Sequence, residues 1–205
     1  MNMYLHELKS LCKATIIWTA ALIALAMIYF SIYPGIANDA ADFKQLLSGY
    51  PASIRAALGI SLDNITSILG FYAMVFSFIT LCGAIQAMNL GVSILSKEVR
   101  ERTADFLLVK PVSRSAIVTA KLLAALAMLL ATNVLYDVAA SILASIVKTS
   151  NYSGKVFLMI SLTLFFIQLI FLAIGMIISV SFTKLKSVLP VSLGVVFGLY
   201  IMAPS

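Results

Sequence analysis

One carboxylate of this sequence stands where it could do chemistry inside a membrane. Asp137 lies in the apolar stretch 116–147, with Asn133 one helical turn earlier and Ser141 one turn later. A charged group near the bilayer centre costs about 2.5 to 3.5 kcal/mol, so we expect Asp137 to face the interior of a helix bundle. The stripe fits two interpretations, the wall of a transport path or a protonated Asp hydrogen-bonded to a neighbouring helix.

A second set of charged residues lies in the polar stretch 96–115, SKEVRERTADFLLVKPVSRS. As a helix, this stretch carries an acidic ridge at i, i+3 and i+7, formed by Glu98, Glu101 and Asp105. Its other side is apolar, with Leu95, Val99, Phe106 and Val109. Pro111 ends the helix at Lys110, and Ser113 can cap the helix that follows. The pattern predicts a rigid charged elbow, and a solvated connector is the alternative.

Enzymatic chemistry lacks the residues it needs. The sequence contains no G-x-x-x-x-G-K-[ST] phosphate loop, so any work driven by a nucleotide requires another chain. The one histidine, His6, lies near the N-terminus rather than in an apolar stretch, which argues against intramembrane hydrolysis. Cys12 and Cys82 are about seventy residues apart and do not suggest a disulfide framework.

The composition identifies the elements that must position these residues. With 62% apolar and 11% charged residues among 205, the chain is too hydrophobic for a water-soluble domain. A bilayer core of about 30 Å needs roughly 20 apolar residues per helical span. We therefore predict an all-α polytopic membrane helix bundle, one transmembrane domain over 1–205, with five spans at 14–33, 65–95, 116–147, 156–182 and 188–203.

Two segments outside the spans have helical patterns of their own. Residues 1–13 predict a short interfacial helix. The outer segment 34–64 predicts two short surface helices, the first capped by Asp39 and the second starting at Pro51. Their apolar stripes would lie on the membrane.

The net charge of +6 is a signature of membrane topology. We do not expect nucleic acid as a partner, because no basic stretch with interleaved aromatics occurs. Of the 14 Lys and Arg residues, ten lie on the side of the N-terminus, and four lie on the other side: Lys44, Arg55, Lys148 and Lys155. This bias predicts a cytoplasmic N-terminus and a cytoplasmic elbow.

Small and amide residues predict where spans meet. Span two repeats a small residue every four positions, at Gly83, Ala87 and Gly91, and span five contains a G-x-x-x-G at Gly194 and Gly198. Interhelical hydrogen bonds are expected from three amides, Gln86, Asn89 and Gln168.

The stretch from Glu98 to Lys121 resembles the signature of membrane permease subunits of type-2 ABC exporters. The matching positions are Glu98, Arg102-Thr103, Asp105, Leu107-Leu108, Pro111-Val112-Ser113-Arg114 and Lys121. The order of the spans, the outer segment and the N-terminal helix also agree, so the resemblance covers nearly the whole chain. The sequence departs from the family in having Arg102 where glycine is common, and five predicted spans where six are usual.

The resemblance implies a mechanism shared between chains. In such permeases the elbow docks into a separate ABC-type ATPase, which binds ATP and Mg, so no cofactor is expected in this chain. The implied coupling residues are Glu98, Glu101, Arg102, Asp105, Phe106, Pro111 and Arg114. A second permease chain, identical or different, would complete a dimer in a bacterial plasma membrane.

Two other classes of function remain open from the sequence. One is an ATP-independent secondary transporter or channel that uses Asp137 for ion or proton coupling. The other is a non-transporting membrane protein, such as an immunity or scaffold subunit. A neighbouring gene for a phosphate-loop ATPase would favour the permease.

Overall fold

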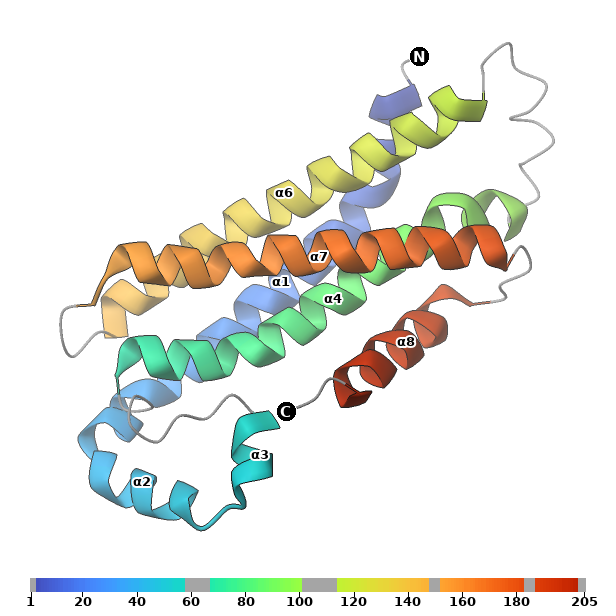
Figure 1. The fold of residues 1–205 in the computed structure, drawn as a ribbon. Coiled ribbons are helices and arrows are strands. Elements are labelled where there is room, and N and C mark those ends of the chain that lie inside the picture. Colours follow the sequence, from blue (N-terminus) through green and yellow to red (C-terminus); the bar gives the residue numbers. More distant parts are fainter. Residues whose placement is uncertain (1–2, 58–66, 101–113, 148–151, 183–186, 203–205) are drawn as a thin grey trace.

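The computed structural model describes residues 3–57, 67–100, 114–147, 152–182 and 187–202, and all regular structure in these ranges is helical (Figure 1). The helices, in chain order, are α1 (Met3–Asn38), α2 (Ala40–Ser48), α3 (Ala52–Ala57), α4 (Ile68–Arg100), α6 (Arg114–Val147), α7 (Gly154–Ser181) and α8 (Val188–Met202). The all-α fold class predicted from composition is confirmed.

Four helices are long and apolar enough to cross a membrane, and each corresponds to one of the first four predicted spans. The fifth predicted span corresponds to α8, which has 15 residues. At a rise of about 1.5 Å per residue it extends about 22 Å, which is less than the roughly 30 Å of a bilayer core. The described residues therefore support four spans and a shorter apolar helix.

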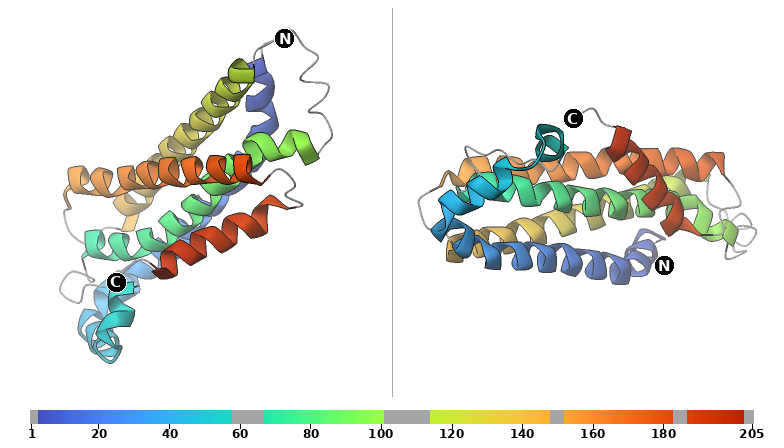
Figure 2. Two further views of the ribbon diagram at one scale, coloured as in Figure 1. Left: turned by 45° about the vertical axis from the view of Figure 1, so that its right-hand side comes forward. Right: turned by 90° about the horizontal axis from the view of Figure 1, so that it is seen from below.

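The four long helices form two layers. Helix α1 packs mainly against α6, and α4 packs mainly against α7, while α8 lies on the α4 side (Figure 2). Within each layer the two helices run in the same direction. Thus Glu7 and Thr19 of α1 meet Lys121 and Thr132 of α6, in that order. The chain changes layer at each connection between long helices.

The first helix differs from the sequence prediction at both ends. Residues 3–13 form the first turns of α1, so the separate interfacial helix predicted over 1–13 is wrong within the described residues. At the other end Pro34 lies inside α1, which continues to Asn38. Proline removes one backbone hydrogen bond but has a helical φ, and the last turn is held by Ile36 and Ala37, which pack on the core.

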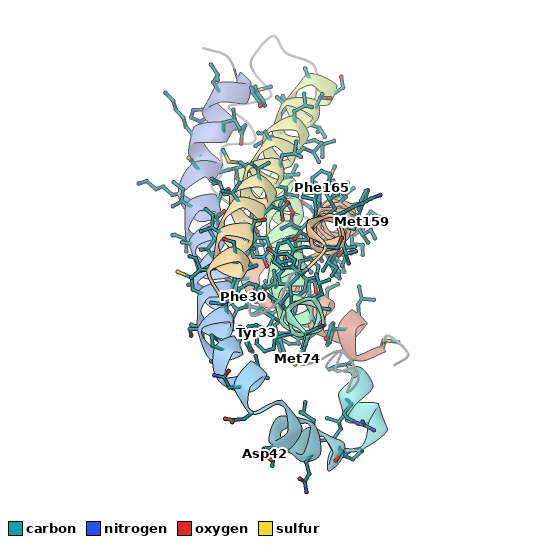
Figure 3. The ribbon with its side chains drawn as sticks, turned by 90° about the vertical axis from the view of Figure 1, so that its left-hand side faces the viewer. Phe30, Tyr33, Asp42, Met74, Met159 and Phe165 are labelled. Atoms are coloured by element: carbon teal, nitrogen blue, oxygen red, sulfur yellow. The ribbon has the colours of Figure 1, made fainter. Side chains whose placement is uncertain are left out.

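The outer segment contains the two predicted short helices. Helix α2 begins directly after Asp39, although the Asp39 side chain makes no capping hydrogen bond, and α3 begins directly after Pro51. Leu46 and Ile54 are exposed, as apolar stripes facing a membrane would be. In Figure 3, Asp42 of α2 lies apart from the bundle.

Aromatic residues fill one end of the bundle, near the outer segment. Phe30 and Tyr33 of α1 point into the core, as Figure 3 shows, and both are almost completely buried. The Tyr72 ring of α4 stacks on Phe30 at 5.8 Å and on Phe157 of α7 at 4.1 Å, measured between ring centroids. These stacks join α1, α4 and α7 at this end.

Glycines set the close approach of α4 and α7. A Cβ on Gly91 would collide with the Leu172 carbonyl oxygen of α7, and one on Gly175 would lie 2.7 Å from the Met88 carbonyl oxygen of α4. A Cβ on Gly83 would meet the Leu164 side chain and lie 3.2 Å from Gln168 Nε2. Ala87, between the two α4 glycines, is fully buried.

The glycines of α8 have different surroundings. No heavy atom of the described residues, apart from the helix's own backbone and chain neighbours, lies within 4 Å of a Cβ built on Gly194 or Gly198. The buried side of α8 is formed instead by Val188, Ser192 and Val196. This G-x-x-x-G therefore does not pack against the described helices of the same chain.

Candidate functional site

Five buried polar side chains form a hydrogen-bonded network where the four long helices meet: Thr19, Gln86, Thr132, Asn133 and Gln168. The Thr19 and Thr132 hydroxyls share a hydrogen bond of 3.0 Å, and Gln86 Nε2 donates to Thr132 Oγ1 at 3.1 Å. Gln168 Nε2 donates to Gln86 Oε1 at 3.3 Å, and Asn133 Nδ2 donates to Gln168 Oε1 at 2.6 Å. The predicted interhelical hydrogen bonds of Gln86 and Gln168 are confirmed.

This network connects the two layers. The bonds from Gln86 to Thr132 and from Asn133 to Gln168 each join α4 or α7 to α6. Asn133 Oδ1 is buried and has no hydrogen-bond partner among the described residues. The groups are neutral amides and hydroxyls, so the network can bind hydrogen-bonding groups but supplies no charge.

A second polar cluster lies nearer the outer segment. Tyr72 OH hydrogen-bonds Ser161 Oγ at 2.7 Å and Tyr136 OH at 3.3 Å, and these three residues are fully or almost fully buried. The Asp137 carboxyl group lies beside the Ser161 hydroxyl. Asp137 Oδ1 is buried and has no hydrogen-bond partner among the described residues. One carboxyl and three hydroxyls therefore form an oxygen cluster between α4, α6 and α7.

The predicted polar stripe of α6 turns away from the interior. Asn133 is buried in the central network, Asp137 is partly buried beside Ser161, and Ser141 is exposed. Steps of four residues advance about 40° beyond a full turn in a helix of 3.6 residues per turn. The structure therefore brings Asn133 and Asp137 to separate polar clusters and does not place Ser141 with either.

An ion pair lies at the opposite end of the bundle. Lys121 Nζ of α6 is 2.9 Å from Glu7 Oε1 of α1, and the side chains are 5% and 15% exposed, respectively. A cavity of about 20 Å³ next to the pair is lined also by Leu11, Leu90, Ser93 and Ile94. The pair is thus largely removed from solvent.

Most of the predicted elbow residues lie outside the described residues, namely Glu101, Arg102, Asp105, Phe106 and Pro111. Glu98 belongs to the last turns of α4, and Arg114 is the first residue of α6. The α4 helix therefore continues without a break through Ser96–Arg100, the first five residues of the predicted elbow.

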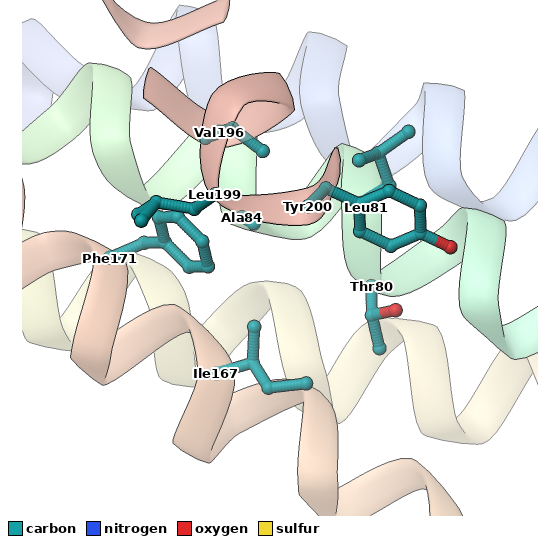
Figure 4. Close-up of a pocket in the computed structure, with 8 residues that line it drawn as sticks. All are labelled: Thr80, Leu81, Ala84, Ile167, Phe171, Val196, Leu199 and Tyr200. Atoms are coloured by element: carbon teal, nitrogen blue, oxygen red, sulfur yellow. The ribbon is translucent and has the colours of Figure 1, made fainter. Parts of the chain in front are cut away.

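An apolar cavity of about 240 Å³ lies between α4, α7 and α8 (Figure 4). It is lined by Thr80, Leu81, Ala84, Ile167, Phe171, Val196, Leu199 and Tyr200. Among the described residues, no three His, Cys, Asp or Glu side chains are placed to hold a metal ion.

Sequence reasoning missed the tyrosine cluster and the partner of Lys121. Tyr72, Tyr136 and Ser161 occur singly in apolar stretches, where no spacing signals that they meet. The sequence does contain an indication of the ion pair. Lys121 is a cation inside a predicted span, and Glu7 is the one acid among residues 1–13. A buried charge requires a partner of opposite sign.

Comparison with known proteins provides the family. A family model described as "ABC-2 family transporter protein" matches residues 1–205. The searches of curated proteins and of solved structures gave no match. The full-length match agrees with the long apolar helices, and the chain is a multi-pass membrane permease rather than an enzyme. The chain belongs to the ABC-2 transporter family.

Proposed function

We propose that this chain is the permease subunit of an ATP-driven exporter and that a separate ABC-type ATPase supplies the energy. Family membership over residues 1–205 is the observation that carries this proposal. The sequence has no phosphate loop, so ATP and Mg bind in the partner and this chain provides no cofactor site.

The elbow 96–115 is the coupling element of this proposal. It connects α4 with α6, and these helices belong to different layers. Because α4 is helical through Arg100, a force on the elbow acts directly on the end of a long helix. The acidic ridge of Glu98, Glu101 and Asp105 and the apolar Phe106 supply the charge and the anchor that a protein interface requires.

The transport path of this proposal follows α6. Asn133, Asp137 and Ser141 spiral from the bundle interior to its surface. The unpartnered oxygens of Asn133 and Asp137 support this assignment, since they can accept hydrogen bonds from a passing substrate.

The chain works as a dimer of permeases with two ATPase subunits in this proposal, in a bacterial plasma membrane with a cytoplasmic N-terminus. The open side of Gly194 and Gly198 on α8 supports a contact with a second permease chain, because small residues allow helices to approach closely in a bilayer. The excess of Lys and Arg on the N-terminal side supports the orientation.

The test is charge reversal of the elbow. A triple variant, Glu98→Lys, Glu101→Lys and Asp105→Lys, should insert in the membrane normally but lose its ATPase in co-purification. A matched control reverses three acids of the outer segment, Asp39→Lys, Asp42→Lys and Asp63→Lys, and changes the net charge equally. We expect the control to retain the ATPase.

The readouts are the amount of ATPase recovered from detergent extract and ATP-dependent transport in proteoliposomes. Normal recovery and normal transport in the elbow variant would show that the elbow is not the coupling element. If the unaltered chain recovers no ATPase at all, the proposal of an ATP-driven permease is itself wrong.

A further inference from the structure

The ion pair of Glu7 and Lys121 connects two helices at the end of the bundle where the elbow begins. Its N–O distance is 2.9 Å, and both side chains are mostly buried. The adjoining cavity of about 20 Å³ has room for about one water molecule. Salt therefore screens this pair much less than an exposed one.

Lys121 lies two helical turns after Arg114, where α6 begins. Glu7 lies in the second turn of α1, and the two residues are 114 positions apart in the sequence. Along the covalent chain, α1 reaches the elbow only through the outer segment and the whole of α4. Across the ion pair, it reaches the start of α6 directly.

The hydrophobic attraction between α1 and α6 is non-directional. A charge-assisted hydrogen bond is directional and roughly twice as strong as a neutral one. Separating the pair would break a contact between two largely buried charges, which is costly. Another polar link, between Thr19 and Thr132, lies about three turns further along both helices.

We propose that Glu7 and Lys121 are positioning residues that make α1 move together with α6 when the ATPase displaces the elbow. This inference rests on the proposed function and adds a second route for the displacement. The elbow acts on α4 and α6 through the chain, and the ion pair extends the action to α1.

The fluorescence of a native tryptophan can report this movement. Trp18 is the one tryptophan of the sequence. It lies in α1 about three turns after Glu7, and it packs on a buried cluster that contains Ala84 and Met88 of α4 and Val196 of α8. Tryptophan emission depends on local surroundings, so a shift of α1 relative to α4 should change it.

The experiment uses the complex of the full chain with its ATPase, with and without ATP and Mg. Emission of Trp18 is obtained as the difference from a Trp18→Phe complex. A dye on Ala104→Cys, in a background without Cys12 and Cys82, reports on the elbow. In the unaltered complex we expect ATP to change both signals.

In Glu7→Gln and in Lys121→Gln, the dye should still respond to ATP, while the Trp18 response should fall at least fivefold. More ATP should then be hydrolysed for each substrate molecule transported. The charge swap, Glu7→Lys with Lys121→Glu, should restore the Trp18 response. Lys9→Gln is the control, because Lys9 is exposed on the same part of α1, and it should leave both signals unchanged.

A merely structural pair gives a different pattern. The neutral double variant, Glu7→Gln with Lys121→Met, removes both charges of the pair and should recover thermal stability without recovering the Trp18 response. If the response returns with stability, or if it persists in both single variants, the inference is wrong. If the dye itself fails to respond to ATP in the unaltered complex, the elbow proposal fails and this inference fails with it.

Discussion

The Asp137 carboxyl group lies next to a cluster of buried hydroxyl groups. Its Oδ1 is buried without a hydrogen-bond partner among the described residues, and the carboxyl group lies beside the Ser161 hydroxyl. Ser161 is in turn bonded to Tyr72, and Tyr72 to Tyr136. Asp137 thus borders a hydrogen-bonded cluster of hydroxyls and has one acceptor unused among the described residues.

This environment predicts different outcomes for two substitutions. Asp137→Asn keeps the shape and one carbonyl acceptor but removes the negative charge, so it should lower ATP-dependent transport while the complex still assembles and hydrolyses ATP. Asp137→Leu also removes any hydrogen bond that the carboxyl group makes, so thermal unfolding should show an additional loss of about 0.6 to 2 kcal/mol.

Proteoliposome transport and thermal unfolding distinguish these effects, and Val138→Leu, a neighbouring exposed apolar position on α6, is the control. Full transport by Asp137→Asn would assign the residue a structural role. It would also remove the main support for a secondary transporter that depends on this charge.

For individual residues, the sequence predicts which polar side chains need hydrogen-bond partners but not which partners they have. Gln86 and Gln168 were expected to form interhelical bonds, and they bond each other. The tyrosine cluster depends on how α4, α6 and α7 align along their axes, and no local sequence pattern predicts this alignment. The stripe of Asn133, Asp137 and Ser141 separates because the helical period is 3.6 and not 4.

Among the helices, the contact between α4 and α7 depends on glycines, which have no side chain to keep the two backbones apart. Gly91 and Gly175 face each other with backbone atoms in contact distance, and Gly83 faces Leu164. Backbone atoms cannot rotate out of the way as side chains do, so a Cβ added at Gly91 or Gly175 must separate the helices.

Gly91→Ala should therefore destabilise the protein by about 1 to 3 kcal/mol, the usual range for overpacking. Gly35→Ala is a matched control, because no heavy atom apart from the helix's own backbone and chain neighbours lies within 4 Å of a Cβ at that position. The two variants are compared by thermal unfolding in detergent. Equal stability of the two would contradict the close packing of α4 and α7 at Gly91.

Helix ends were less predictable than helix existence. The spans at 116–147 and 156–182 agree with α6 and α7 within two residues at each end. For α1, an amphipathic start and a proline suggested two boundaries that the helix crosses. Both signals are local, whereas packing of Ile36 and Ala37 on the core and of Glu7 on Lys121 continues the helix. The coupling residues from Glu101 to Pro111 lie outside the described residues and stay a prediction.

For the whole chain, the orientation in the membrane decides whether a cytoplasmic ATPase can reach the elbow. In a background without Cys12 and Cys82, Gln45→Cys on α2 should react with an impermeant maleimide added to intact cells. Ala104→Cys should react only after the membrane is opened. The ten-to-four distribution of Lys and Arg underlies this expectation. The reverse labelling pattern would place the elbow outside, where no cytoplasmic ATPase reaches it.

The alternation of the chain between layers has a consequence for biosynthesis. Helix α1 finds its main partner, α6, only after α4 has been made, and α4 must wait for α7. Until α6 emerges from the ribosome, Glu7 lacks its ion-pair partner and Thr19 lacks Thr132. The earliest spans therefore enter the bilayer with unpaired polar groups and complete their pairing late. A stalled chain that ends before α6 would keep these polar groups unpaired in the bilayer. The unpaired groups would allow membrane quality control to recognise the incomplete chain.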